Sequence, residues 1–166
     1  MSEDPAEPPP AIEIGTFADH PELVPEVVAI AWDEWGAEHA EDPRDRWLRE
    51  AELDSRLHSP MSAGFLAVAG GHAVGTVQLH EFEIDAIRDR SPWVCGMVVR
   101  PEYRSMGVGR RLLAALERFA ADHRVSRLWV FTEEAAGFYE RCGWERWGEA
   151  IEDGEPGVVL TRALPV

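Results

Sequence analysis

The fold is decided by the stretch Val99-Arg-Pro-Glu-Tyr-Arg104-Ser-Met-Gly107-Val-Gly109-Arg-Arg111. It joins an apolar run at 93–99, which predicts a strand, to an amphipathic run at 107–123, which predicts a long helix. The two glycines remove Cβ atoms where the backbone must turn tightly and approach a ligand. The first N–H groups of the helix point at that ligand, and the helix dipole favours an anion. The stretch therefore predicts a phosphate-binding turn.

Two other phosphate-binding motifs fail on spacing. A dinucleotide-binding fingerprint needs a third glycine where Leu112 stands, and a P-loop needs Gly-Lys-Ser/Thr. An ordinary glycine-containing helix start would leave the distribution of charge unexplained. Residues 100–127 contain seven Arg and three acidic residues, whereas residues 1–60 contain four Arg and sixteen acidic residues. A basic segment in a chain of formal charge −15 is best explained by a bound anion.

The composition narrows the class of protein. A length of 166 residues, 45% of them hydrophobic, with seven Trp, predicts one globular domain over 12–166. The acidic, proline-rich stretch at 1–11 predicts a disordered tail and lacks the pattern of a secretory signal. The acidity argues against nucleic acid as a partner, and no apolar run reaches the roughly 20 residues that span a membrane. Cys95 and Cys142 lack metal-ligand spacing and predict reduced thiols in a cytoplasmic protein.

Hydrophobic periodicity predicts an alternation of strands and helices. Asp19, followed three residues later by Glu22, resembles a capping box for the first helix. The predicted order is β-α-α-β-β-β-α-β-α-β-β, an α/β fold with a mixed sheet. Strands are expected at 11–17, 64–69, 72–83, 93–99, 127–131, 144–150 and 158–163, and helices at 23–39, 43–57, 107–123 and 134–142.

Two stretches resemble the signatures of the GNAT family of N-acetyltransferases. Val99–Gly109 is similar to the acetyl-CoA motif, Arg/Gln-x-x-Gly-x-Gly/Ala, and Ala135-Ala-Gly-Phe138-Tyr139-Glu-Arg-Cys-Gly143-Trp is similar to the Phe-Tyr-Glu-x-x-Gly-Phe segment. They stand at the family's usual separation, and the resemblance covers about 65–164. It implies a sheet of about seven strands with helices on both faces, splayed between the fourth and fifth strands.

The resemblance also implies acetyl-CoA as co-substrate and an amine as acceptor. No metal is expected. The pantetheine arm would lie between the strands 93–99 and 127–131, with an N–H of Val98 or Val99 donating to the oxyanion. Thr132 stands where the family often has an Asn that contacts the pantetheine. The cofactor-binding residues implied in this way are Met97, Val98, Val99, Arg104, Ser105, Met106, Gly107, Val108, Gly109, Arg110, Thr132 and Phe138.

The chemistry requires an acid and a base. In the family's pattern, Tyr139 protonates the leaving thiolate, while Cys142 and Cys95 are expected to be core thiols. Many relatives carry an acidic residue on the strand at 93–97, and this chain has none. Strand alternation would place Glu81 and Glu83 toward the splay and His80 away from it, and Glu83 is the favoured base. The acids Asp33, Glu34 and Glu38 on the first helix are further candidates.

The acceptor side is expected on the first two helices. The segment 32–42 is acidic and contains Trp32 and Trp35, which look exposed. Together with Glu81, these carboxylates and aromatic faces would bind a cationic small amine. The alternatives are a solvated helix face, an enzyme that acetylates a peptide or protein amine, and a sensor that binds acetyl-CoA without catalysis. The sequence leaves the oligomeric state open, although members of the family often form homodimers through terminal strands.

Overall fold

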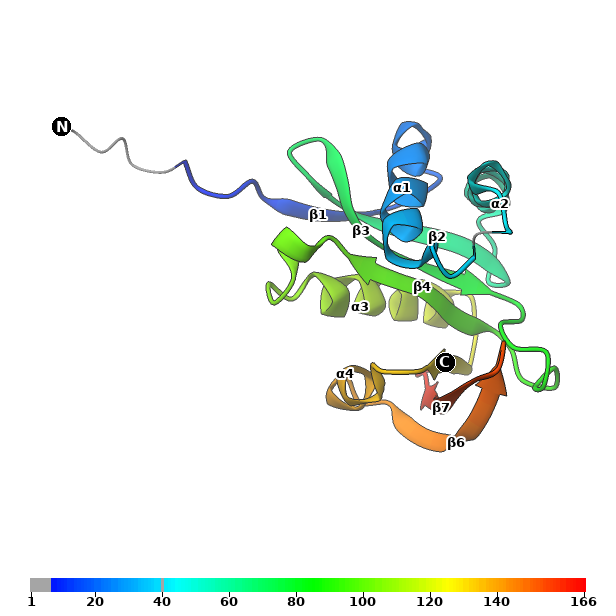
Figure 1. The fold of residues 1–166 in the computed structure, drawn as a ribbon. Helices are drawn as coiled ribbons and strands as arrows, with labels where there is room; N and C mark the ends of the chain where they lie inside the picture. Colours follow the sequence, from blue (N-terminus) through cyan, green and yellow to red (C-terminus); the bar gives the residue numbers. More distant parts are fainter. Residues whose placement is uncertain (1–6, 40) are drawn as a thin grey trace.

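The computed structural model describes residues 7–39 and 41–166, which form one seven-stranded sheet in the order β1-β2-β3-β4-β5-β7-β6 (Figure 1). The predicted order of elements and the predicted sheet of about seven strands are confirmed. The strands are β1 Ile12–Thr16, β2 Ser62–Ala69, β3 His72–His80, β4 Trp93–Val99, β5 Arg127–Thr132, β6 Glu145–Glu152 and β7 Glu155–Ala163. The helices are α1 Val24–Trp35, α2 Arg44–Leu57, α3 Val108–Asp122 and α4 Ala136–Arg141, with 3-10 turns η1 Pro21–Leu23 and η2 Pro101–Tyr103.

Helices cover both faces of the sheet. Figure 1 shows α1 and α2 above the strands β2 to β4, and α3 below them. The apolar stripe of α3 is buried against one face, whereas α1 packs against the other. Each stripe follows from the 3.6-residue period of an amphipathic helix. The fully buried stripe residues of α3 are Leu112, Leu113, Leu116 and Ala120, and those of α1 include Val24, Val27 and Ile30.

The sheet opens between β4 and β5. These two strands run parallel and pair only through Trp93 with Trp129 and Val94 with Val130. On the other side of β4 the register with β3 shifts, so that Gly96 and Met97 together face a single residue of β3. This is a β-bulge, and Gly96 has the positive φ of 62° that such a kink requires. The bulge bends β4 at the point where its pairing with β5 ends, which confirms the predicted splay.

Two predicted details at the helix starts and ends are wrong. Asp19 does not cap the first helix: its N–H and its carboxylate both bond to the hydroxyl of Thr16, at 3.1 and 2.8 Å. Pro21 begins the first turn instead, where no N–H is needed. Helix α1 ends at Trp35 rather than near residue 39, because the following residues form tight turns, such as the bond from Glu38 N–H to Trp35 O.

The predicted tail at 1–11 falls largely outside the described residues, which begin at residue 7, and residues 7–11 belong to no helix or strand. Within the described chain, no helix combines the length and the apolar character that crossing a bilayer would need.

The contact between Gly64 and Phe17 gives a test of the packing. A methyl group on Gly64 would overlap the ring of Phe17, which is fully buried. We expect Gly64→Ala to lower the free energy of unfolding by about 1–3 kcal/mol, the usual cost of overpacking a core. Gly148→Ala in β6 is the matched control, because nothing lies within 4 Å of its new methyl group. Equal urea midpoints for the two variants would contradict this packing.

Candidate functional site

The start of α3 presents unpaired backbone donors. Its first helical hydrogen bond runs from Arg111 N–H to Gly107 O, at 3.1 Å, and no side chain caps the helix. The N–H groups from Gly107 to Arg110 therefore lack helical partners. The preceding turn has positive φ at Ser105, 62°, and at Gly107, 76°, which directs these donors to one side. Because the helix dipole adds positive potential, the α3 start is suited to an anion such as a phosphate.

Arg104, the predicted side-chain ligand of the phosphates, is held by two other groups. Its Nε donates to the carbonyl of Val99 at 2.8 Å, and its Nη2 lies 3.3 Å from Glu34 Oε2 on α1. Both side chains of this ion pair are nearly half exposed, so it contributes about 0–1 kcal/mol. A pyrophosphate beside the α3 start can therefore displace Glu34 from the guanidinium. The neighbouring Arg111 donates to the carbonyl of Ile12 at 2.9 Å, and Arg110 is exposed.

One backbone amide of β4 faces the opening. Arg100 N–H donates to Val74 O at 2.8 Å, which fixes the alternation of the antiparallel ladder. The N–H of Val98 then points to β3, whereas the N–H of Val99 points away from β3 and toward the splay. Of the two oxyanion donors expected from the sequence, the alternation favours Val99. The buried side chain of Val98 packs instead in the core beneath α1.

Residues from three elements form the wall next to the α3 start. A Cβ atom at Gly109 would lie 3.4 Å from the ring of Phe138 on α4 and 3.9 Å from the sulfur of Met97 on β4. These two side chains are half-buried, and Val108 is fully buried. The other two predicted residues of the turn, Ser105 and Met106, are exposed.

The hydroxyl oxygen of Thr132 already accepts a hydrogen bond from within the protein. The Oγ1 atom accepts a hydrogen bond from Ala135 N–H at 2.9 Å, just before α4. Its hydroxyl proton can still be donated to a ligand.

Tyr139 is on α4 and is buried in the hydrophobic core, with only 4% of its surface exposed. Its ring packs edge-on against Phe138 and Trp144, with centroids 5.1 and 5.5 Å away. Burial raises the pKa of its hydroxyl, and the nearby Cys95, Cys142 and Glu83 raise it further. The hydroxyl therefore stays protonated near neutral pH, as a proton donor must.

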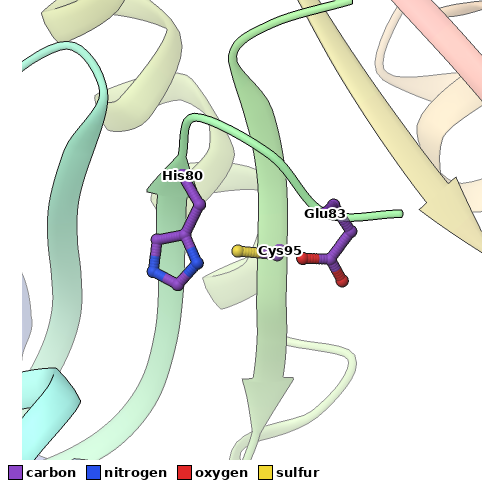
Figure 2. A group of neighbouring side chains, drawn as sticks. All are labelled: His80, Glu83 and Cys95. Carbon is purple, nitrogen blue, oxygen red and sulfur yellow. The ribbon is translucent and has the colours of Figure 1, made fainter. Parts of the chain in front are cut away.

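The side chains of His80, Glu83 and Cys95 converge at the end of β3 (Figure 2). Their donor atoms all lie within 4.8 Å of one another. The sequence-based expectation that His80 and Glu83 point to opposite sides is wrong, because β3 ends at His80 and strand alternation does not extend into the loop. Cys95 belongs to β4 and is the first residue after the pairing with β5 stops.

This cluster perturbs the titration of its members. Burial raises the pKa of Glu83, although the residue keeps solvent access, and nearby His80 and Cys95 oppose the rise. Burial lowers the pKa of His80, but its hydrogen bond to Asp54 and the charges of Asp54 and Glu83 outweigh this and raise the pKa overall. Burial also raises the pKa of the Cys95 thiol.

Asp54 is the residue that sequence reasoning missed. It is 8% exposed, and its Oδ2 lies 3.0 Å from His80 Nε2. Its Oδ1 accepts a hydrogen bond from the hydroxyl of Ser62. The available signal was helical spacing, since Asp54 lies three residues after the buried Ala51 and hence on the same face of α2.

The acceptor-side tryptophans are less exposed than the sequence indicated. Trp32 is half-buried and packs edge-on against Trp47, with ring centroids 5.1 Å apart. Trp35 is half-buried against the core beneath α1. The carboxylates around them are exposed: Asp33, Glu34, Glu38 and, in the loop after β3, Glu81.

The splayed sheet, the unpaired donors at the α3 start and the buried tyrosine are the features expected of an acyl-CoA-dependent N-acyltransferase. The family model described as Acetyltransferase (GNAT) family matches residues 24–144. The chain therefore belongs to the GNAT acetyltransferase family.

Solved structures share this fold. An aminoglycoside 6'-N-acetyltransferase complexed with coenzyme A has 17% identical residues and a TM-score of 0.73, covering 93% of this chain and 98% of its own. An aminoglycoside 6'-acetyltransferase type Ii has 19% identity and a TM-score of 0.73, with coverage of 93% and 99%. A GNAT acetyltransferase from Staphylococcus aureus Mu50 has 19% identity and a TM-score of 0.71, with coverage of 93% and 100%. No curated protein sequence matches the chain.

Two substitutions test the turn before α3. Gly107→Ala places a side chain at a φ of 76°, with nothing within 4 Å to clash, so the cost is conformational and about 1–2 kcal/mol. We expect a melting temperature lower by about 2–4 °C per kcal/mol and weaker binding of acetyl-CoA in calorimetry. Ser105→Gly is the converse control, since it relieves a positive φ of 62° and should keep or raise stability. Unchanged acetyl-CoA affinity in Gly107→Ala would remove the turn from the cofactor site.

Proposed function

We propose that the chain transfers the acetyl group of acetyl-CoA to a primary amine by direct attack, and that the amine belongs to a cationic small molecule. The observation that supports this proposal most is the position of the α3 start, because its unpaired N–H groups lie beside the splay of β4 and β5. Buried Tyr139 lies near Cys95, the residue at which the splay begins. The coenzyme A bound to a protein of this fold supports the same cofactor here.

The residues at the site fit acetyl-CoA. The N–H groups at the α3 start, with Arg104 released from Glu34, would hold the pyrophosphate. The pantetheine arm would run along β4 past Met97, within reach of the free N–H of Val99 and against Phe138. Bound acetyl-CoA supplies the thioester carbon that the amine attacks.

Three groups of this chain would carry the proton and charge changes. An alkylamine has a pKa near ~10 and attacks only when neutral, so a base must take up its proton. The pKa of Glu83 is raised toward neutral pH, which makes its carboxylate a more effective base. The N–H of Val99 would stabilise the negative oxygen that develops during attack. The hydroxyl of Tyr139 would return a proton to the departing thiolate.

A cationic acceptor suits the charge on the α1 and α2 side. Residues 1–60 carry a net charge of −12, from four Arg and sixteen acidic residues. Asp33, Glu34 and Glu38 are exposed on and after α1, and Glu81 is exposed in the loop that carries Glu83. Such a surface raises the local concentration of polyamines or aminoglycosides. Two proteins of this fold are aminoglycoside acetyltransferases, which supports the same class of acceptor.

One continuous sheet links the strands from β1 to β7, which supports a single domain over 12–166.

The decisive experiment follows release of coenzyme A from acetyl-CoA by thiol detection, with a panel of polyamines, aminoglycosides, arylalkylamines, and basic and acidic peptides. We expect release that depends on a polycationic small amine. Release with peptides alone would replace this proposal by a protein-modifying enzyme. Tight binding of acetyl-CoA without release for any acceptor would replace it by a sensor.

Tyr139→Phe tests the proton donor. The variant keeps the buried ring and loses only the hydroxyl, so we expect the fold and acetyl-CoA binding to persist. Turnover should fall roughly tenfold or more, because the thiolate then leaves without its proton donor. The measurement is kcat with the best acceptor of the panel, together with the Kd for acetyl-CoA. A kcat equal to that of the wild type would exclude Tyr139 from the mechanism.

Glu83→Gln tests the base through its pH dependence. The wild-type rate should fall as the pH drops through the raised pKa of Glu83, since the carboxylate then gains a proton. Glu83→Gln should lower kcat roughly tenfold or more and abolish that acid limb of the pH–rate profile. Asp89→Asn is the matched control, an exposed acid in the same loop that pairs with Arg90. An identical acid limb in Glu83→Gln would assign the base elsewhere.

A further inference from the structure

The convergence of His80, Glu83 and Cys95 brings three different donor types to one point. They come from the end of β3, the loop after it and β4, and Figure 2 shows the sulfur of Cys95 directed toward the imidazole of His80. Imidazole nitrogen, thiolate sulfur and carboxylate oxygen are the ligands that Zn²⁺ takes in proteins. Three protein ligands with a fourth position open is the arrangement of an accessible zinc site rather than a closed structural one.

The spacing suits a zinc ion after a small movement. A tetrahedral zinc with one sulfur and one nitrogen ligand holds these atoms about 3.5 Å apart. The three donor atoms already lie within 4.8 Å of one another. Glu83 stands in the loop between β3 and β4 and retains solvent access, so its carboxylate can approach without moving a strand.

Asp54 adds an independent observation. Its buried carboxylate lies 3.0 Å from Nε2 of His80 and is itself held by Ser62. The imidazole then donates Nε2–H to Asp54, which leaves the lone pair of Nδ1 for another partner. In Figure 2 one ring nitrogen of His80 faces the side of Cys95 and Glu83. A carboxylate that orients a histidine in this way is the usual outer partner of a metal-bound imidazole.

We propose that His80 Nδ1, Glu83 and Cys95 bind Zn²⁺, with Asp54 as the positioning residue, and that the bound ion inhibits acetyl transfer. On binding, the ion displaces the proton of the Cys95 thiol. The ion with one thiolate, one carboxylate and one neutral imidazole has no net charge, which suits a half-buried position. The inhibitory part rests on the proposed function, because the ion engages the base Glu83 at the point where β4 leaves β5.

Zinc binding is measured without any acceptor, by calorimetric titration of the whole chain with Zn²⁺. We expect one equivalent bound, and at least tenfold weaker binding in His80→Ala and in Cys95→Ser. Cys142→Ser is the matched control, because it removes the other free thiol and lies outside the cluster. Affinity in His80→Ala and Cys95→Ser equal to that of the wild type would overturn the site.

A second measurement does not depend on the ligand variants folding, because it uses the wild-type protein and the Cys142→Ser control. Co²⁺ added to the wild-type protein should give a thiolate-to-cobalt absorption band, because Cys95 is one of the ligands, and Zn²⁺ should abolish it. The same band must persist in Cys142→Ser. A cobalt complex without thiolate absorption would overturn the ligand set.

Inhibition is measured by adding Zn²⁺ to the assay for coenzyme A release. We expect the rate to fall and to recover when a chelator is added, with less inhibition in His80→Ala. Zinc that binds in calorimetry and leaves the rate unchanged would disprove the inhibitory role while keeping the site. An absence of any acetyl transfer would contradict the proposed function alone, since binding of Zn²⁺ and Co²⁺ is read independently.

Discussion

The structure depends on one constraint, the β-bulge at Gly96. Hydrogen bonds close the gap between neighbouring strands of a sheet, so a ligand can enter between two strands only where their ladder stops. The bulge bends β4 after two paired positions with β5, leaving the Val99 amide without a strand partner. The same divergence places Cys95 at the point where β4 leaves β5, and Tyr139 lies close to it. In the proposed function, the backbone groups left unpaired here would hold the pantetheine arm.

The second half of the site follows from the first. Since β4 ends at the opening, the turn that follows it must bring the chain straight into α3, and the positive φ values of Ser105 and Gly107 accomplish this. The uncapped start of α3 therefore lies at the mouth of the splay. Acidic helices cover the other face of the sheet, so the molecule separates a helix start suited to anions from a surface suited to cations.

Much of this could be read from the sequence because the decisive signals are local. The strand 93–99 and the glycine-rich turn after it lie within a dozen residues, and hydrophobic periodicity predicted the order of the elements along the chain. The cluster of Asp54, His80, Glu83 and Cys95 could not be read, because its members come from separate elements and meet only through tertiary packing. Strand alternation also failed to predict that His80 and Glu83 converge, because the strand ends at His80. Gly96 within an apolar run was the one local hint of a bulge.

The ion pair between Arg104 and Glu34 connects the two ends of the site. One guanidinium serves both: it neutralises the Glu34 carboxylate on α1, and in the proposed function a pyrophosphate at the turn would draw it away. The departure of the guanidinium would leave the negative charge of Glu34 unneutralised on the helix opposite. Binding of acetyl-CoA would then attract a cationic amine, so that competition for a single side chain would favour one order of substrate binding.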